Sequence, residues 1–167
     1  GTKVLSVAGD CAKPGVYEVE FGLTVAAVLD MVGATDAKAV QIGGPSGGCI
    51  PAQHLDAPID YDSLTSLGAI MGSGGLVVTD ETTCMVDLAR YFMNFVQQES
   101  CGQCLPCRWG TQVMLDTLTR ICDGQGQTGD IEALERLAAT VKVSSLCGLG
   151  QTAPNPVLST LRHFQAE

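Results

Sequence analysis

The chain has 167 residues, the size of one ordinary domain or of two small ones. Its 9 basic and 18 acidic residues give a formal net charge of -9, which opposes binding to a phosphate backbone, so no nucleic-acid partner is expected. Hydrophobic residues make up 46% and charged residues 16%, which favours a folded chain over a disordered one. The longest weakly polar stretch, residues 67–78, is too short to cross a bilayer, so no direct insertion into a membrane is expected.

The start of the chain carries no basic segment followed by an apolar run, as a secretory signal would require. This predicts a cytoplasmic protein. Because the first residue is Gly1 rather than Met, the sequence is interpreted as a piece of a longer protein.

The first half of the chain alternates short runs rich in β-branched residues with glycine and proline. Four runs predict strands: residues 4–7, 16–21, 40–42 and 76–78. Apolar residues at helical spacing follow Thr24 and stop at Gly33, which predicts a helix with a glycine after its end. This order predicts a small β-grasp, or ubiquitin-like, α+β domain over residues 1–80, with a loop-rich return over residues 43–75.

In the second half the apolar period becomes 3.6 residues, which predicts four short amphipathic helices forming a bundle over residues 81–167. The expected starts, in chain order, are Thr82 or Thr83, Pro106, Thr128 or Asp130, and Asn155. The last helix has Asn155 as its expected N-cap. Its expected buried face consists of Leu158, Leu161 and Phe164. The fold class is therefore α+β, with a β-grasp domain followed by a four-helix bundle.

Three cysteines, Cys101, Cys104 and Cys107, lie within seven residues between the first and second of these helices. A C-x2-C-x2-C run lets one loop hold three corners of an iron-sulfur cube, and the fourth iron then needs a thiolate from elsewhere. Cys147 is the preferred fourth ligand, because its loop between the third and fourth helices lies at the same end of an antiparallel bundle. The bundle is therefore predicted to carry a 4Fe-4S cluster.

Cys122 is the alternative fourth ligand, but its helical spacing with Leu118 favours a place in the core. A structural zinc ion is the alternative to the cluster, although zinc sites usually take their cysteines as two separated pairs. It would make the chain a non-redox scaffold or partner-binding module. Arg108 is interpreted either as a donor to the cluster sulfurs or as a solvated charge at a helix end.

Two glycine-rich segments, residues 43–48 and 72–75, suggest phosphate-binding loops by composition alone. Neither has the P-loop lysine or a helix after a G-x-G-x-x-G turn. Both are predicted to be tight turns, so these residues give no sign of a nucleotide or flavin site.

Residues 99–110, ESCGQCLPCRWG, followed by Cys147, resemble the NADH-binding flavoprotein subunit of respiratory complex I. The same module occurs in flavin subunits of NAD(P)-dependent hydrogenases and of formate dehydrogenases. Residues 42–48 and 72–83 resemble the soluble-ligand-binding β-grasp domain of that family, so the resemblance covers nearly the whole chain. Trp109 is a departure, since members more often carry an acidic residue there.

The resemblance implies that Cys101, Cys104, Cys107 and Cys147 ligate a 4Fe-4S cluster. The cluster would take electrons from FMN and pass them to further clusters of an NADH:quinone oxidoreductase, a hydrogenase or a formate dehydrogenase. FMN and NAD(P)H are expected only in the full-length subunit, on an N-terminal domain without a counterpart in these residues. The chain alone is therefore not expected to act as an NADH dehydrogenase.

The resemblance also implies the surroundings of the chain. Its expected partners are its own N-terminal flavin domain and other redox subunits of a multi-subunit complex. Through that complex it could lie peripherally on the inner face of the membrane. Gly148, Leu149 and Gly150 are expected to lie near the flavin.

Overall fold

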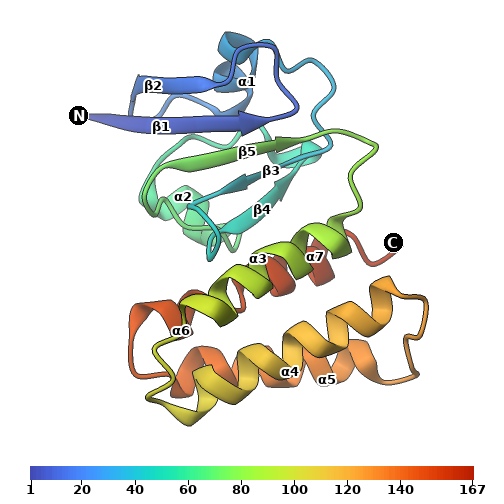
Figure 1. Cartoon of the computed structure of the whole chain (residues 1–167). Helices are drawn as coiled ribbons and strands as arrows, with labels where there is room; N and C mark the ends of the chain where they lie inside the picture. The colour runs from blue at the N-terminus through green and yellow to red at the C-terminus, as the bar shows by residue number, and fades with distance from the viewer. The chain divides into compact units, whose positions relative to one another are not determined.

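The computed structural model describes all 167 residues, which form five strands and seven α-helices (Figure 1). The chain divides into two compact units, Gly1–Thr83 and Cys84–Glu167. The sheet lies wholly in the first unit, and helices α3 to α7 make up the second. The predicted α+β class is confirmed. None of the helices combines the length and the apolar character needed to cross a membrane.

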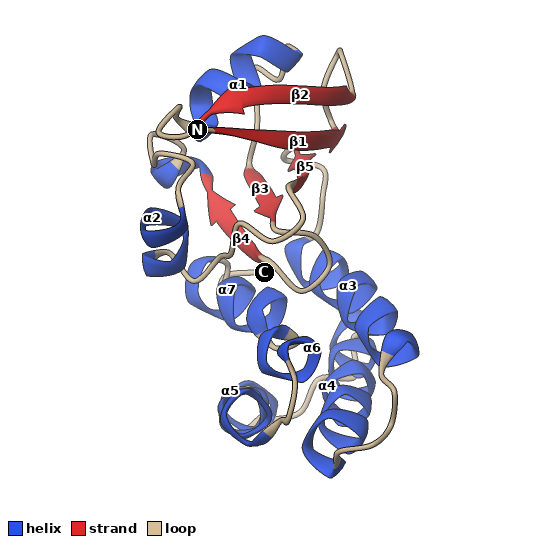
Figure 2. Cartoon of the chain, turned by 90° about the vertical axis from the view of Figure 1, so that its left-hand side faces the viewer, coloured by secondary structure: helices blue, strands red, loops and turns tan.

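The first unit is built on a five-stranded sheet with the order β2-β1-β5-β3-β4 (Figure 2). The strands are β1 (Thr2–Gly9), β2 (Gly15–Glu20), β3 (Ala39–Ile42), β4 (Gly48–Pro51) and β5 (Gly75–Thr79). The central pair β1 and β5 is parallel, and all other neighbours are antiparallel. Strand β4 lies in the segment predicted as loop, because glycine and proline bound its four residues and mask their pairing with β3.

Helix α1 (Val25–Val32) begins and ends where the sequence predicts. The Thr24 hydroxyl accepts a hydrogen bond from the Ala27 amide at 3.2 Å, and Gly33 follows the last turn with a left-handed φ of 68°. The apolar face of α1 packs into the core of the first unit, which it shares with Leu5 and Ile42 of the sheet. Two further short helices in the predicted loop region, η1 (Ala52–His54) and α2 (Tyr61–Ser66), were not predicted.

The two glycine-rich segments of the first unit pack backbone against backbone. A β-carbon on Gly43 would lie 2.3 Å from the Ile70 carbonyl oxygen, and one on Gly72 would lie 2.4 Å from the Gly43 carbonyl oxygen. Both glycines also have positive φ, at 95° and 49°. Only glycine fits at these positions, so the prediction of tight turns is confirmed.

The second unit contains five helices. They are α3 (Met85–Glu99), α4 (Leu105–Cys122), α5 (Asp130–Ser144), α6 (Gly148–Thr152) and α7 (Asn155–His163). Helix α3 packs against α4 and α7, while α5 packs against α4, α6 and α7. The short α6 was not predicted, because five residues with two glycines carry no helical apolar period.

Two predicted helix starts are wrong, because in each case the residue expected to cap the helix forms hydrogen bonds with another side chain instead. Thr82 does not cap α3, because its backbone amide and its hydroxyl both donate hydrogen bonds to the Asp80 carboxylate in a turn. The helix begins only at Met85. Asn155 is the first residue of α7 rather than its cap, and its buried side chain accepts a hydrogen bond from Lys142 Nζ at 3.1 Å. Helix α5 begins at Asp130, preceded by Gly129.

The core of the second unit includes Met93, Met114, Leu134 and Val157, one from each long helix and one from α7. Val157 is the fully buried apolar residue of α7. Three residues expected to be buried there, Leu158, Leu161 and Phe164, are only half-buried. The helical spacing located the helix but placed its apolar face slightly wrongly.

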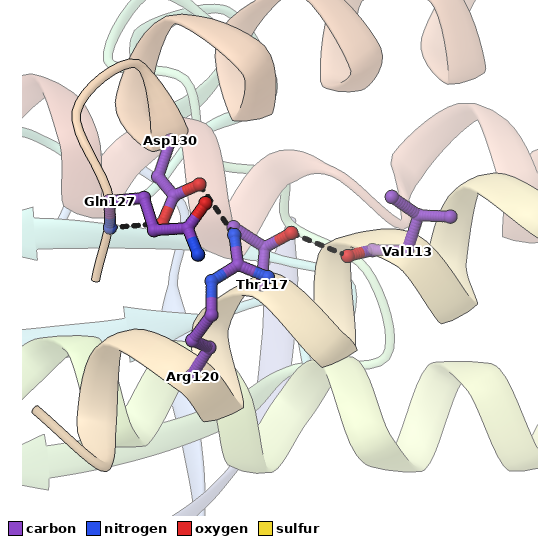
Figure 3. A network of polar contacts seen from close by, with 5 residues as sticks. All are labelled: Val113, Thr117, Arg120, Gln127 and Asp130. Atoms are coloured by element: carbon purple, nitrogen blue, oxygen red, sulfur yellow. Dashed lines mark hydrogen bonds and ion pairs between the residues drawn. The ribbon is translucent and has the colours of Figure 1, made fainter. Parts of the chain in front are cut away.

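A polar network joins α4 to the start of α5 (Figure 3). The guanidinium of Arg120 forms an ion pair with Asp130, whose other carboxylate oxygen accepts a hydrogen bond from the Gln127 amide at 2.8 Å. Thr117 donates back to the Val113 carbonyl within α4. The network closes the turn between the two helices at the end of α4 that is distant from Cys107.

Candidate metal centre

The two loops that carry the predicted ligands meet at one end of the second unit. Cys104 lies at the N-cap position of α4, and Cys107 lies in the first turn of that helix. Cys147 lies at the N-cap position of α6, after the loop that follows α5. The segment after Cys147 reaches α4, since a β-carbon on Gly150 would lie 3.1 Å from Cys107 Cβ. Figure 1 shows the α3–α4 and α5–α6 connections at the same end of the helices.

Cys104 is in surroundings that favour its thiolate. Its pKa is lowered from the usual value, first by the Leu146 amide, then by the Cys107 amide, with a smaller contribution from the Ser145 hydroxyl. The start of α4 adds to this, because unpaired amides and the positive end of the helix dipole favour negative charge there. The thiolate is the form of cysteine that binds a metal.

Cys107 is the buried member of the set, with 4% of its surface exposed. Burial raises its pKa, and hydrogen bonding to Ser100 opposes that rise. Negative charge on Cys104, Cys147 and Cys101 raises it further. All three therefore lie near enough to Cys107 to act on its pKa. Their role as joint ligands of one cluster stays a prediction.

The four thiols differ in their access to solvent. Cys101 and Cys147 are exposed, Cys104 is half-buried and Cys107 is buried, and none of them forms a disulfide. The site therefore has an inner side in the helical core and an outer side at the surface. No three His, Cys, Asp or Glu side chains converge as the ligands of a single metal ion would.

Arg108 holds the loop between the first two ligands. Its Nη1 donates to the Gly102 carbonyl oxygen at 2.9 Å, and Gly102 adopts a left-handed φ of 72°. The guanidinium is exposed at the start of α4, as the interpretation of a solvated charge at a helix end predicts, and it is also bound to the backbone of the loop that holds the cysteines. Its donation to cluster sulfurs stays a prediction.

Cys122 is placed far from this site. It is the last residue of α4, fifteen residues after Cys107 on one continuous helix, or about 22 Å away at about 1.5 Å per residue. Its side chain is exposed, so the expectation that it packs in the core is wrong. The helical spacing with Leu118 is real, but at the end of the helix nothing covers that position. Cys84 is exposed as well.

The three residues expected near a flavin follow Cys147 directly. Gly148 is exposed with open space around the position of a β-carbon, and Leu149 is half-buried. Gly150 is buried, and a β-carbon there would lie 2.6 Å from Ser145 Oγ and 3.1 Å from Cys107 Cβ. Their approach to a flavin stays a prediction.

Two serines beside the cysteines were missed by the sequence analysis. Ser100 Oγ lies 3.3 Å from Cys107 Sγ, and Ser145 is buried next to Gly150. Their closeness in sequence to Cys101 and Cys147 was the one feature that could have identified them. The direction in which a hydroxyl points, however, cannot be inferred from sequence alone.

The chain is similar to known proteins. Residues 87–167 match the family model of the NADH-ubiquinone oxidoreductase-F iron-sulfur binding region. Over its full length the chain is 45% identical to the NADP-reducing hydrogenase subunit HndC of Solidesulfovibrio fructosivorans, covering 35% of that protein. It is likewise 39% identical to an F-type NADH-quinone oxidoreductase subunit of Rhizobium meliloti, covering 41% of it.

Solved structures show the same fold. The crystal structure of an NAD+-reducing [NiFe]-hydrogenase in the H2-reduced state superposes with a TM-score of 0.89 at 34% identity, over 99% of this chain and 28% of that one. The chain thus spans well under half the length of the relatives it matches. Residues 87–167 belong to the iron-sulfur binding region of the NADH-ubiquinone oxidoreductase-F family, and the chain as a whole is similar to subunits of NADH-quinone oxidoreductases and of NAD-reducing hydrogenases.

Proposed function

We propose that this chain is the electron-transfer portion of an NADH-oxidising flavoprotein subunit. It would receive electrons from FMN on another domain of the same protein and pass them through one 4Fe-4S cluster to further clusters of a complex. The observation that carries this proposal is that two cysteine-bearing loops, residues 101–107 and the loop of Cys147, lie at one end of the helices, with Gly150 packed beside Cys107.

The donor set suits a 4Fe-4S cluster. A cubane cluster takes one thiolate per iron, and the four cysteines supply four thiols with no nitrogen or oxygen ligand among them. The group supplies one-electron redox chemistry when bound. The chain itself needs no general acid or base for that chemistry, and its residues hold the thiolates, shield the Cys107 side from water and leave the Cys101 side accessible.

An apolar surface beside the site supports docking of a redox partner. Leu105, Trp109 and Val113 follow each other at four-residue spacing on α4, with exposed fractions of 60%, 62% and 45%. Leu146, next to Cys147, is 82% exposed. Exposed apolar side chains clustered at one site are typical of an interface. We assign this surface to the flavin domain of the same protein or to the next redox subunit.

We assign the first unit to the soluble-ligand-binding β-grasp fold, residues 1–80, and residues 81–167 to a helical 4Fe-4S-binding domain built as a four-helix bundle. The parallel pair β1 and β5 at the centre of a mixed sheet with α1 packed into its core supports the first assignment. The long helices α3, α4 and α5 with α7 support the second, with α6 as an added turn that presents Cys147.

We also infer that Gly148 and Leu149 lie on the path of electrons from the flavin, with Gly150 behind them. They follow Cys147 at the surface, where a flavin could approach the exposed side of the site. In the full-length subunit, Leu149→Ala should change the rate of flavin-to-cluster transfer measured by rapid mixing with NADH. An unchanged rate would remove Leu149 from this path.

The proposal is tested by anaerobic purification of the chain, followed by measurement of iron, acid-labile sulfide and zinc. We expect about four irons and four sulfides per chain and an electron paramagnetic resonance signal after dithionite reduction. Stoichiometric zinc without sulfide would instead support the alternative, a scaffold or partner-binding module with a structural zinc site. A folded chain that takes up no cluster on reconstitution would also contradict the proposal.

A further inference from the structure

The hydroxyl of Ser100 is in direct contact with a predicted ligand. Ser100 Oγ lies 3.3 Å from Cys107 Sγ, and the same oxygen accepts a hydrogen bond from the Gly102 amide at 3.3 Å. The residue ends α3 as its C-cap, immediately before Cys101. The backbone amide of Ser100 also donates to the Gln97 carbonyl, so backbone hydrogen bonds hold both its main chain and its hydroxyl in place.

The direction of this hydrogen bond follows from the chemistry of a metal ligand. In a free thiol, either Ser100 or Cys107 could supply the hydrogen. A cysteine that binds iron has lost its proton, so the only hydrogen left in the contact is that of the Ser100 hydroxyl. The Gly102 amide already uses a lone pair of the serine oxygen, which leaves the hydroxyl hydrogen free to point at the sulfur.

Ser145 is a second hydroxyl on the inner side of the site. Only 4% of its surface is exposed, and its Oγ has no hydrogen-bond partner of normal geometry in the protein. Ser145 packs against Gly150, where a β-carbon would lie 2.6 Å from Ser145 Oγ and 3.1 Å from Cys107 Cβ, so the hydroxyl lies beside the cysteine site. A buried hydroxyl without a partner is destabilising, so its presence calls for an acceptor in the working protein.

We propose that Ser100 and Ser145 donate hydrogen bonds to the sulfur atoms of the bound cluster and raise its reduction potential. One-electron reduction adds negative charge to the cluster and its thiolates. A donor aimed at the sulfurs stabilises the reduced form more than the oxidised one. The two serines would thus set the reduction potential of the cluster without carrying electrons themselves. This inference rests on the proposed electron-transfer function.

The test is a redox titration of the reconstituted chain, with dithionite as reductant and the spectroscopic signal of the reduced cluster as readout. We expect Ser100→Ala and Ser145→Ala each to lower the midpoint potential, and the double variant to lower it further. Ser100→Thr keeps the hydroxyl and should restore the wild-type potential.

Ser144→Ala is the matched control. Ser144 is adjacent to Ser145, but its hydroxyl donates to the Thr140 carbonyl within α5, so its removal should leave the potential unchanged. An exchangeable hydrogen coupled to the reduced cluster should be detected by pulsed paramagnetic resonance in deuterated water. The signal of this exchangeable hydrogen should weaken in Ser100→Ala. Because Ser100 is only half-buried, this variant should fold and test the proposal even if Ser145→Ala does not fold.

The outcomes separate the two proposals. A wild-type chain that binds no cluster would contradict the electron-transfer function itself. Serine variants that bind the cluster with unchanged potential and unchanged hydrogen coupling would overturn only the assignment of Ser100 and Ser145.

Discussion

Gly110 of α4 lies directly against Val141 of α5, so closely that a β-carbon on Gly110 would stand 2.2 Å from Val141 Cγ2. Both residues are buried. A glycine inside a helix costs about 1 kcal/mol relative to alanine, so its presence here is explained by the close approach of the two helices. This contact lies one turn from Cys107 and holds the ligand-bearing start of α4 against α5.

Gly110→Ala should therefore destabilise the chain despite the better helix propensity of alanine. Overpacking a core contact costs roughly 1–3 kcal/mol, and the rigid χ1 of Val141 limits relief by rotation. With the middle of that range less the gain in helix propensity of about 1 kcal/mol, we expect the free energy of unfolding in urea to fall by about 1 kcal/mol. In the double variant with Val141→Ala, the cost should be smaller than the sum of the two single changes. A Gly110→Ala chain as stable as wild type would show that the helices separate without cost.

Replacement of single cysteines should distinguish ligands from bystanders. We expect Cys147→Ser to lose the intact 4Fe-4S cluster, because its loop supplies the only thiolate from outside the 101–107 run. Cys122→Ser should bind iron and sulfide as wild type does, because α4 holds Cys122 about 22 Å from Cys107. Iron and sulfide analysis with paramagnetic resonance measures both. Loss of the cluster in Cys122→Ser and its survival in Cys147→Ser would reverse the ligand assignment.

The ion pair between Arg120 and Asp130 should give the second unit an acid-sensitive stability. The pKa of Asp130 is lowered, first by the Gln127 amide and then by the Arg120 guanidinium, below its value in the unfolded chain of about 3.9. Its stabilisation is therefore fully present above that unfolded value and is lost as the pH falls through the lower folded value. We expect Asp130→Asn to reduce stability at neutral pH.

The same variant should also flatten the fall in stability on acidification below about pH 5, measured by urea unfolding across pH 2 to 7. Exposed Glu132→Gln, two residues further along α5, serves as the control and should keep the acid dependence of wild type. An Asp130→Asn chain with the full acid dependence would place the responsible carboxylate elsewhere.

Arg108 should affect how well the loop retains a cluster. Its bond to the Gly102 carbonyl holds the segment between Cys101 and Cys104 in a left-handed turn. Arg108→Ala should therefore lose the cluster several-fold faster in air, followed as the decay of visible absorbance. Arg136→Ala, an exposed arginine of α5, controls for the loss of one positive charge. Equal decay rates for the two variants would mean that the loop holds its shape without the guanidinium.

Helix caps show how far local sequence information reaches in this protein. Thr24 and Gly33 could be predicted because their partners, the Ala27 amide and the carbonyls of the last turn, lie within four residues. Thr82 and Asn155 could not, because Asp80 and Lys142 compete for the groups that would have formed the caps. The same limit applies to β4, which exists only because it pairs with β3.

The three-thiol loop could be predicted from the amino-acid sequence, because the spacing of Cys101, Cys104 and Cys107 is local. The order of the predicted helices favoured Cys147 over Cys122 as the fourth ligand. Tertiary packing, by contrast, is what places Gly150 beside Cys107 and the Ser100 hydroxyl 3.3 Å from the Cys107 sulfur. The place of the Cys147 loop beside α4 depends on how α4 packs against α5, where Gly110 lies against Val141. These two residues are 31 positions apart in the sequence, and no local pattern of residues encodes their contact.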